Sequence, residues 1–229
     1  MRKLLFCFLF LQALNAMADR LPISANVGLS SDYIFRGISQ TDETVAIQGG
    51  FDYAHSSGFY LGVFGSNVDF NNPDSSIEID GYGGFKHSFL DHYGIDTGVI
   101  HYAYPNANDA YSYNEYYMGG NYRNFSLKAY YSDDFFANSG EAVYIDSKGD
   151  FSLPYHFMLG LHYGYQWIEN NAKFGTPDYA DWRVGINREF IGVNVGVAYV
   201  DTNLDKNECF SGSSLCSSRA VVSISKVFE

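Results

Sequence analysis

The fold is decided by two alternating runs around a short turn, Gln48-Gly49-Gly50-Phe51-Asp52-Tyr53-Ala54, His55-Ser56-Ser57-Gly58 and Phe59-Tyr60-Leu61-Gly62-Val63-Phe64-Gly65-Ser66. In the first run Phe51 and Tyr53 fall on one face, and Gln48 and Asp52 fall on the other. Strict alternation closed by a Gly/Ser turn indicates a β-hairpin. The arms exceed the common strand length of about five to six residues. Long arms with one apolar, aromatic-edged face predict membrane-crossing strands of a closed barrel.

The same alternating pattern recurs along the chain and predicts twelve strands. We expect them at residues 23–35, 45–54, 59–66, 77–86, 93–104, 113–122, 125–132, 141–148, 155–166, 178–187, 190–200 and 219–228. An even number of strands brings both chain ends to one side of a barrel. The sequence therefore predicts an all-β fold, a single closed antiparallel transmembrane β-barrel of 12 strands. Barrels of 10 or 14 strands are the alternatives.

The connections between these strands alternate in length. Those after the even-numbered strands are short, such as Arg123-Asn124, whereas those after the odd-numbered strands are mostly longer and more polar. Outer-membrane barrels have short periplasmic turns and long outer loops, so the alternation of connection lengths matches this class of barrel. A soluble β-sandwich, the alternative fold, gives no reason for such sorting.

The first eighteen residues have the pattern of a secretory signal peptide. Arg2 and Lys3 precede an apolar run, and Ala16-Met17-Ala18 provides a small-x-small cleavage site. The alternative, an N-terminal membrane anchor, is disfavoured because the apolar run is too short to span a bilayer. We expect a signal peptide at 1–18 and an exported barrel at 19–229.

Composition narrows the function classes. The chain has 20 Tyr, 19 Phe and 23 Gly but only 17% charged residues, and no later stretch approaches the roughly 18 consecutive apolar residues of a membrane helix. Its net charge of −12 opposes binding to nucleic acid, which requires basic surface. Cys209 and Cys216 lie in a Gly/Ser-rich segment, where an exported protein forms a disulfide. No further Cys or His lies near this pair to complete a metal site, since Cys7 falls in the expected signal peptide, and no cofactor is expected.

Several segments resemble the Gcw_chp, or TorF-type, porin family of Gram-negative bacteria. They are Asn26-Val27, Ser31-Asp32-Tyr33, Phe35-Arg36-Gly37-Ile38-Ser39-Gln40, Gln48 to Tyr53, Gly58-Phe59-Tyr60, Ser66-Asn67-Val68, Glu78-Ile79-Asp80, Tyr130 to Asp134 and the Ser225-Lys226-x-Phe228 ending. The resemblance implies a barrel in the outer membrane with a pore role, whose partners are outer-membrane lipid, the barrel assembly machinery and small polar solutes or ions. The Cys209/Cys216 pair and the trailing Glu229 depart from that family pattern.

Charged residues on the polar faces are the candidates for lining a pore. They are Asp32, Arg36, Asp52, Glu78, Asp80, Lys86, Asp96, Glu115, Lys128, Asp181 and Arg183, with Asp146 and Lys148 on the same faces. Near-balanced charge allows either a ladder of salt bridges or an open polar channel. Because the predicted outer loops are rich in Asp and Glu, we expect a weak cation preference. The segment Arg36 to Gln40 is expected at the rim or folded inward, or else as a β-bulge turn at Gly37.

The sequence is compatible with three functions. The first is a porin for passive diffusion, and the second is a closed structural or surface-interaction barrel without transport. The third, an outer-membrane hydrolase, is disfavoured because the sequence has no Gly-x-Ser-x-Gly motif. His156 and His162 share one predicted strand, but six residues of strand place them roughly 20 Å apart, too far for one metal ion. We therefore expect no enzymatic activity.

Overall fold

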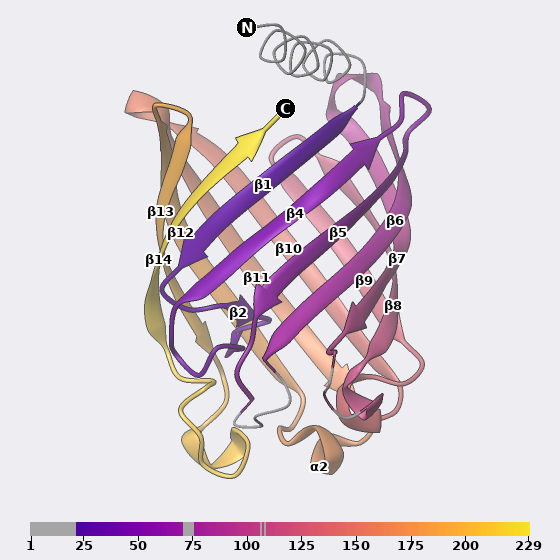
Figure 1. Ribbon diagram of the computed structural model, residues 1–229, viewed down its shortest axis with the longest axis vertical. Helices are drawn as coiled ribbons and strands as arrows, with labels where there is room; N and C mark the ends of the chain where they lie inside the picture. The colour runs from indigo at the N-terminus through magenta and orange to yellow at the C-terminus, as the bar shows by residue number, and fades with distance from the viewer. Residues whose placement is uncertain (1–21, 71–75, 106, 108) are drawn as a thin grey trace, which may run out of the picture.

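The computed structural model describes residues 22–70, 76–105, 107 and 109–229. The expected signal peptide, residues 1–18, lies outside the described residues. Within the described part, twelve strands form one closed antiparallel barrel in which each strand pairs with its neighbours in the chain (Figure 1). They are β1 (Ile23–Ser30), β4 (Ala46–Ala54), β5 (Phe59–Asn67), β6 (Ile77–Phe89), β7 (Tyr93–Ala103), β8 (Tyr113–Tyr122), β9 (Phe125–Ser132), β10 (Ala142–Leu153), β11 (Phe157–Ile168), β12 (Tyr179–Phe190), β13 (Val193–Thr202) and β14 (Arg219–Phe228).

The barrel closes where the first and last strands meet. β1 pairs with β14 from Ala25 opposite Phe228 to Ser30 opposite Ser223, and with β4 on its other side. Closure satisfies the backbone hydrogen-bonding groups that an open sheet would expose at its edges. The predicted twelve-strand barrel is confirmed. Among the described residues, no helix is both long and apolar enough to cross a membrane.

The two ends of the barrel differ as the sequence predicts. The connections at the end that holds the C-terminus are short, such as residues 55–58, 123–124 and 191–192, and the opposite end carries the longer loops and the one-turn helix α2 (Asn171–Phe174) (Figure 1). Three strands, 113–122, 125–132 and 219–228, have the predicted bounds. Others differ by a few residues, and His156 lies in the turn Pro154–His156 rather than on a strand.

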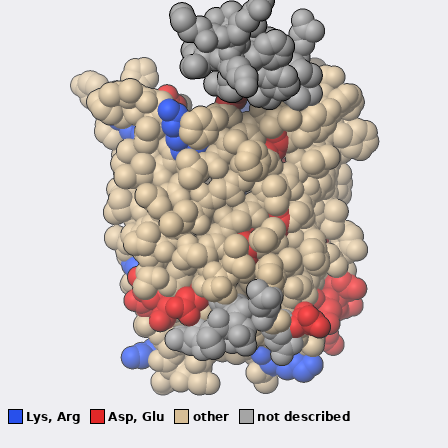
Figure 2. All heavy atoms as spheres, viewed as in Figure 1, with Lys and Arg blue, Asp and Glu red and all other residues tan. Residues whose placement is uncertain are grey.

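The outer wall is apolar. Val27, Leu29, Phe51 and Leu61 are among the large apolar side chains exposed on it, whereas the alternate residues of the same strands face the interior. Exposed aromatic side chains lie near the short-turn end (Phe89, Tyr93, Tyr122, Phe125, Phe190) and near the loop end (Tyr116, Tyr131, Trp167, Tyr199). Figure 2 shows the middle of one face almost free of charged residues, with Asp and Glu gathered toward the loop end. Such a wall suits a hydrocarbon surrounding.

The first predicted strand is too long. β1 ends at Ser30, and the chain then enters the barrel and forms a small hairpin of β2 (Ile34–Phe35) and β3 (Ile38–Ser39) (Figure 1). A strand over 23–35 would place Tyr33 and Phe35 on the same lipid-facing side as Val27 and Leu29, and this prediction is wrong. Instead, Tyr33 donates a hydrogen bond to Glu78 and Phe35 packs against Tyr102. The prediction failed because apolar residues alternate in an inward-folded hairpin as they do in a strand of the barrel wall.

Candidate functional site

The inward hairpin turns at two residues with left-handed backbone. Arg36 has a φ of 47° and Gly37 a φ of 80°, the pattern of a two-residue type I′ turn. Gly37 also approaches the wall closely, since a Cβ there would lie 2.5 Å from Cγ2 of Thr202 and 2.7 Å from Cβ of Asp181. Of the alternatives for Arg36 to Gln40, the inward-folded loop is therefore confirmed.

Arg36 crosses the interior to the far wall. Its Nη2 donates to Oε2 of Glu115 on β8, and its Nη1 donates to Oε1 of Gln166 on β11, each at 2.7 Å. The guanidinium lies over the ring of Tyr144, with its Cζ 4.1 Å from the ring centroid. Burial opposes the charge, but the adjacent Glu115 carboxylate keeps the pKa of Arg36 above its ordinary value. The guanidinium therefore connects the hairpin to β8 and β11 across the lumen, and we call its ion pair with Glu115 the hairpin tie.

A second group of contacts holds the base of the hairpin at the seam of the barrel. Asp32 accepts from Ser39 Oγ at 2.7 Å and from Thr41 Oγ1 at 2.9 Å, and pairs with Arg219 of β14 at 2.8 Å. Nearby, Oη of Tyr33 donates to Glu78 at 2.7 Å. Burial, together with that carboxylate, raises the pKa of Tyr33, so it remains a donor.

The disulfide loop supports the other side of the hairpin. Cys209 and Cys216 are joined, which confirms the predicted disulfide. Leu215 accepts a backbone hydrogen bond from Ser39 at 3.0 Å, and the buried side chain of Ile38 packs against the cystine and Tyr179. The loop after β13 therefore contacts the hairpin directly.

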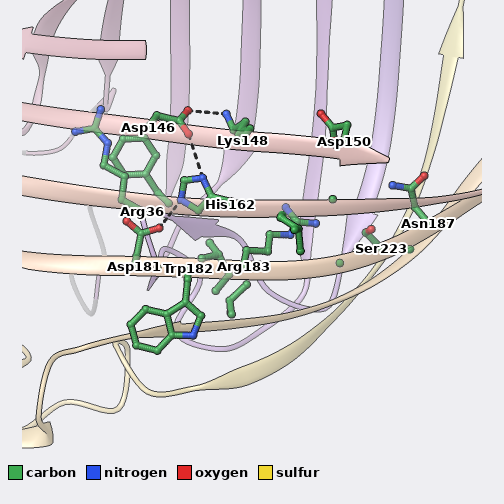
Figure 3. A pocket seen from close by; sticks show the side chains of 18 of the residues that line it. Arg36, Asp146, Lys148, Asp150, His162, Asp181, Trp182, Arg183, Asn187 and Ser223 are labelled. Atoms are coloured by element: carbon green, nitrogen blue, oxygen red, sulfur yellow. Dashed lines mark hydrogen bonds and ion pairs between the residues drawn. The ribbon is translucent and has the colours of Figure 1, made fainter. Parts of the chain in front are cut away.

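A polar cavity of about 480 Å³ lies between the hairpin and the short-turn end of the barrel. Figure 3 shows its wall of β10, β11 and β12, from which Asp146, His162 and Asp181 point toward one another. The ring nitrogens of His162 lie 3.0 Å from Oδ1 of Asp146 and 2.7 Å from Oδ1 of Asp181. Lys148 donates to Asp146 at 2.6 Å. Tyr144 donates a hydrogen bond to Asp181 at 2.8 Å. Because the Arg36 guanidinium lies over the ring of Tyr144, this bond connects the network around His162 to Arg36.

Farther along the cavity the charges are less engaged. Asp150, Arg183, Asn187 and Ser223 line the part toward the short turns (Figure 3). Among the described residues, neither Asp150 nor Arg183 has a partner of opposite charge within ion-pair distance. Both residues are exposed, so this part of the lumen carries charges of each sign that lack an ion pair among the described residues.

In the half of the interior near β5 to β9, which we call the tyrosine-rich half, polar side chains of different strands contact one another. Oη of Tyr60 contacts the hydroxyl of Tyr117 and donates to Asp96 at 2.6 Å, and Lys128 pairs with the same Asp96 at 2.5 Å. Tyr82 donates to Asp52 on β4. The polar cavity, in contrast, is lined mainly by residues of the hairpin and of β10–β14.

The candidate residues thus fall into separate groups. Arg36 and Glu115 meet in the hairpin tie, Glu78 and Asp32 contact its neighbouring residues, and Asp181 and Arg183 border the cavity. Asp52, Asp96 and Lys128 lie in the tyrosine-rich half, where Nζ of Lys86 is 5.8 Å from the ring centroid of Tyr60. Asp80 is buried, and its Oδ1 has no hydrogen-bond partner among the described residues. Whether these residues line a conducting pore stays a prediction.

Two residues that organise the site, Gln166 and Tyr144, were not among the pore-lining candidates predicted from the sequence. Both have the inward parity of their strands, as His162 does, which was the available signal. Their importance depends on the hairpin reaching them, which strand periodicity does not encode. Among the described residues, no group of His, Cys, Asp or Glu is arranged to hold a metal ion.

An apolar outer wall around a polar, partly hollow interior defines the class of this protein, a porin-like β-barrel. The chain belongs to the Gcw_chp family, described as bacterial proteins of unknown function, whose sequence profile matches residues 16–228. No curated protein sequence matches the chain.

Solved porins share the fold at low sequence identity. The KdgM porin superposes with a TM-score of 0.59 at 10% identity, covering 90% of this chain and 99% of that one. KdgM in complex with disordered oligogalacturonate gives 0.56 at 9% identity, covering 90% and 99%. The NanC porin gives 0.53 at 10%, covering 90% and 98%. Similarity at this level supports the architecture.

Proposed function

We propose that this protein is an outer-membrane porin, of the TorF type that the sequence resembles, through which small polar solutes and ions diffuse passively. The observation that carries the proposal is the polar cavity of about 480 Å³ inside a barrel whose outer wall is apolar. A barrel that served only as a wall element could fill this space with apolar side chains, as protein interiors do. The likeness to KdgM and NanC supports the same reading. No catalytic role is part of the proposal.

The hairpin is the proposed constriction of this path. Its tip residues Arg36 and Gly37 border the polar cavity, and Phe35 borders both this cavity and a second one on the loop side. Solute passage then depends on the space beside the hairpin and on how firmly the tie between Arg36 and Glu115 holds it.

We further propose a weak cation preference. The cavity wall carries three carboxylates, Asp146, Asp150 and Asp181, against the three cations Arg36, Lys148 and Arg183, with His162 beside them, so the cavity itself carries no excess of negative charge. The loop end adds acidic side chains such as Asp42, Glu43, Asp133, Asp134 and Asp205, which raise the local cation concentration at the mouth.

A closed structural barrel is the second candidate, favoured by one observation. Phe35 of the hairpin lines both the polar cavity and the cavity on the loop side, and a closed barrel requires its side chain to block the passage between them. Swelling of protein-loaded liposomes in isotonic solutions of small sugars distinguishes the two functions. A porin gives swelling rates that fall with solute size, whereas a closed barrel gives the rate of empty liposomes.

A further inference from the structure

A second cavity, of about 360 Å³, lies on the loop side of the hairpin, and we call it the outer aromatic cavity. It lies among residues of the long loops and the loop ends of the strands. Phe136 lines it together with three rings that it contacts, its ring centroid lying 4.6 Å from that of Tyr111, 5.5 Å from that of Phe70 and 5.7 Å from that of Tyr104. Phe174 of α2 contacts both Phe136 and Phe210.

These rings pack directly against one another and together form a wall of the cavity. Packed protein interiors retain few voids larger than a water molecule, so a cavity of this volume is not ordinary core packing. Small-molecule sites are concave, mostly apolar or aromatic, and carry a few placed polar groups. The outer aromatic cavity matches that description.

Among the described lining residues, Lys173 alone carries a charge. Its side chain is exposed on α2, and its Nζ donates to the backbone oxygen of Asn138 at 3.0 Å. An ammonium group has three donors, so two remain for a ligand. A cation beside an aromatic wall is complementary to a flat ring that carries an anionic group.

We propose that the outer aromatic cavity binds a small aromatic carboxylate, with its ring among Tyr111, Phe136 and Phe174 and its carboxylate on Lys173. The aromatic lining favours this class over a sugar acid, whose hydroxyl groups would require several hydrogen-bond partners. The inference goes beyond the porin proposal, because binding here does not require conduction.

The test is a titration of the full barrel, refolded into lipid nanodiscs, with 4-fluorobenzoate followed by fluorine NMR. We expect saturable binding. Lys173→Gln should weaken the affinity about tenfold, the loss typical of a charge-assisted hydrogen bond, and leave that of the uncharged 4-fluorobenzamide unchanged. Lys206→Gln is the matched control, since Lys206 lies in another long loop and does not line the cavity, and it should alter neither affinity.

A second variant tests the cavity itself. Ser213→Trp places a large ring into the space and should abolish binding of both probes, while heat-modifiable mobility in gels shows that the barrel is folded. Absence of saturable binding to the wild-type barrel would overturn the inference, as would unchanged affinity in both Lys173→Gln and Ser213→Trp. Stronger competition by galacturonate than by benzoate would show that the ligand class is wrong. A barrel that binds the probe but passes no solute would contradict only the porin proposal.

Discussion

Arg36 and Glu115 form an ion pair that joins the hairpin to the opposite wall of the barrel, with 2.7 Å between Nη2 and Oε2. The two side chains are only 5% and 2% exposed. Because both side chains are almost completely shielded from water, solvation stabilises neither charge much, and each charge is stabilised mainly by the other. The position of the hairpin therefore depends on a contact between residues 79 positions apart in the chain.

Removing one partner of this pair should cost more than removing both. Arg36→Met leaves the Glu115 carboxylate buried without a cation, and we expect a loss of about 3–5 kcal/mol in the free energy of unfolding. In the double variant Arg36→Met/Glu115→Leu much of that loss should be recovered, since no lone charge remains. Urea titration of the barrel in vesicles measures both values. Additive losses would show that the charges do not act as a pair.

Gly37 should be sensitive to any side chain. Gly37→Ala adds a Cβ within 2.7 Å of both Thr202 and Asp181, so the hairpin must move away from β12 and β13. We expect a changed single-channel conductance. Gly192→Ala is the matched control, because its φ of 72° carries a similar backbone cost, but nothing lies within 4 Å of the new Cβ. Equal effects of the two substitutions would assign the change to backbone strain alone.

Loss of the disulfide should loosen the hairpin without opening the barrel. The bridge closes a short loop, so Cys209→Ser/Cys216→Ser should lower stability by about 2 kcal/mol. Ile38 and Ser39 contact this loop, and we expect faster amide exchange there but unchanged exchange in β6 and β7. Hydrogen-exchange mass spectrometry provides the measurement. Unchanged protection at residues 38–39 would show that the loop does not hold the hairpin.

The barrel could be read from the sequence because period-two alternation and the sorting of loop lengths are local properties. The inward hairpin could not, because Tyr33 and Phe35 continue the apolar phase of β1 while facing the opposite environment. Which inward charges meet also depends on the register between neighbouring strands, which places Asp96 and Lys128 on either side of Gly119. Asp96 and Lys128 lie on strands separated by β8, and no spacing in the chain places them 2.5 Å apart.

Ion selectivity should shift in opposite directions at two neighbouring positions. Asp150 on β10 and Arg183 on β12 both border the polar cavity without an ion pair among the described residues. Asp150→Asn removes a negative charge and should lower the cation preference, whereas Arg183→Gln removes a positive charge and should raise it. Reversal potentials under a KCl gradient give the sign. Shifts of the same sign would place the selectivity outside this cavity.

Under the porin proposal, water and ions pass through this barrel beside the hairpin. Single-channel recording of the refolded protein in planar bilayers measures this passage, with wild type and Arg36→Ala compared under one salt condition. We expect discrete conductance steps in wild type and larger steps in Arg36→Ala, because the tie to Glu115 is lost. Folded barrels that give no steps in either protein would contradict the claim and leave a closed structural barrel.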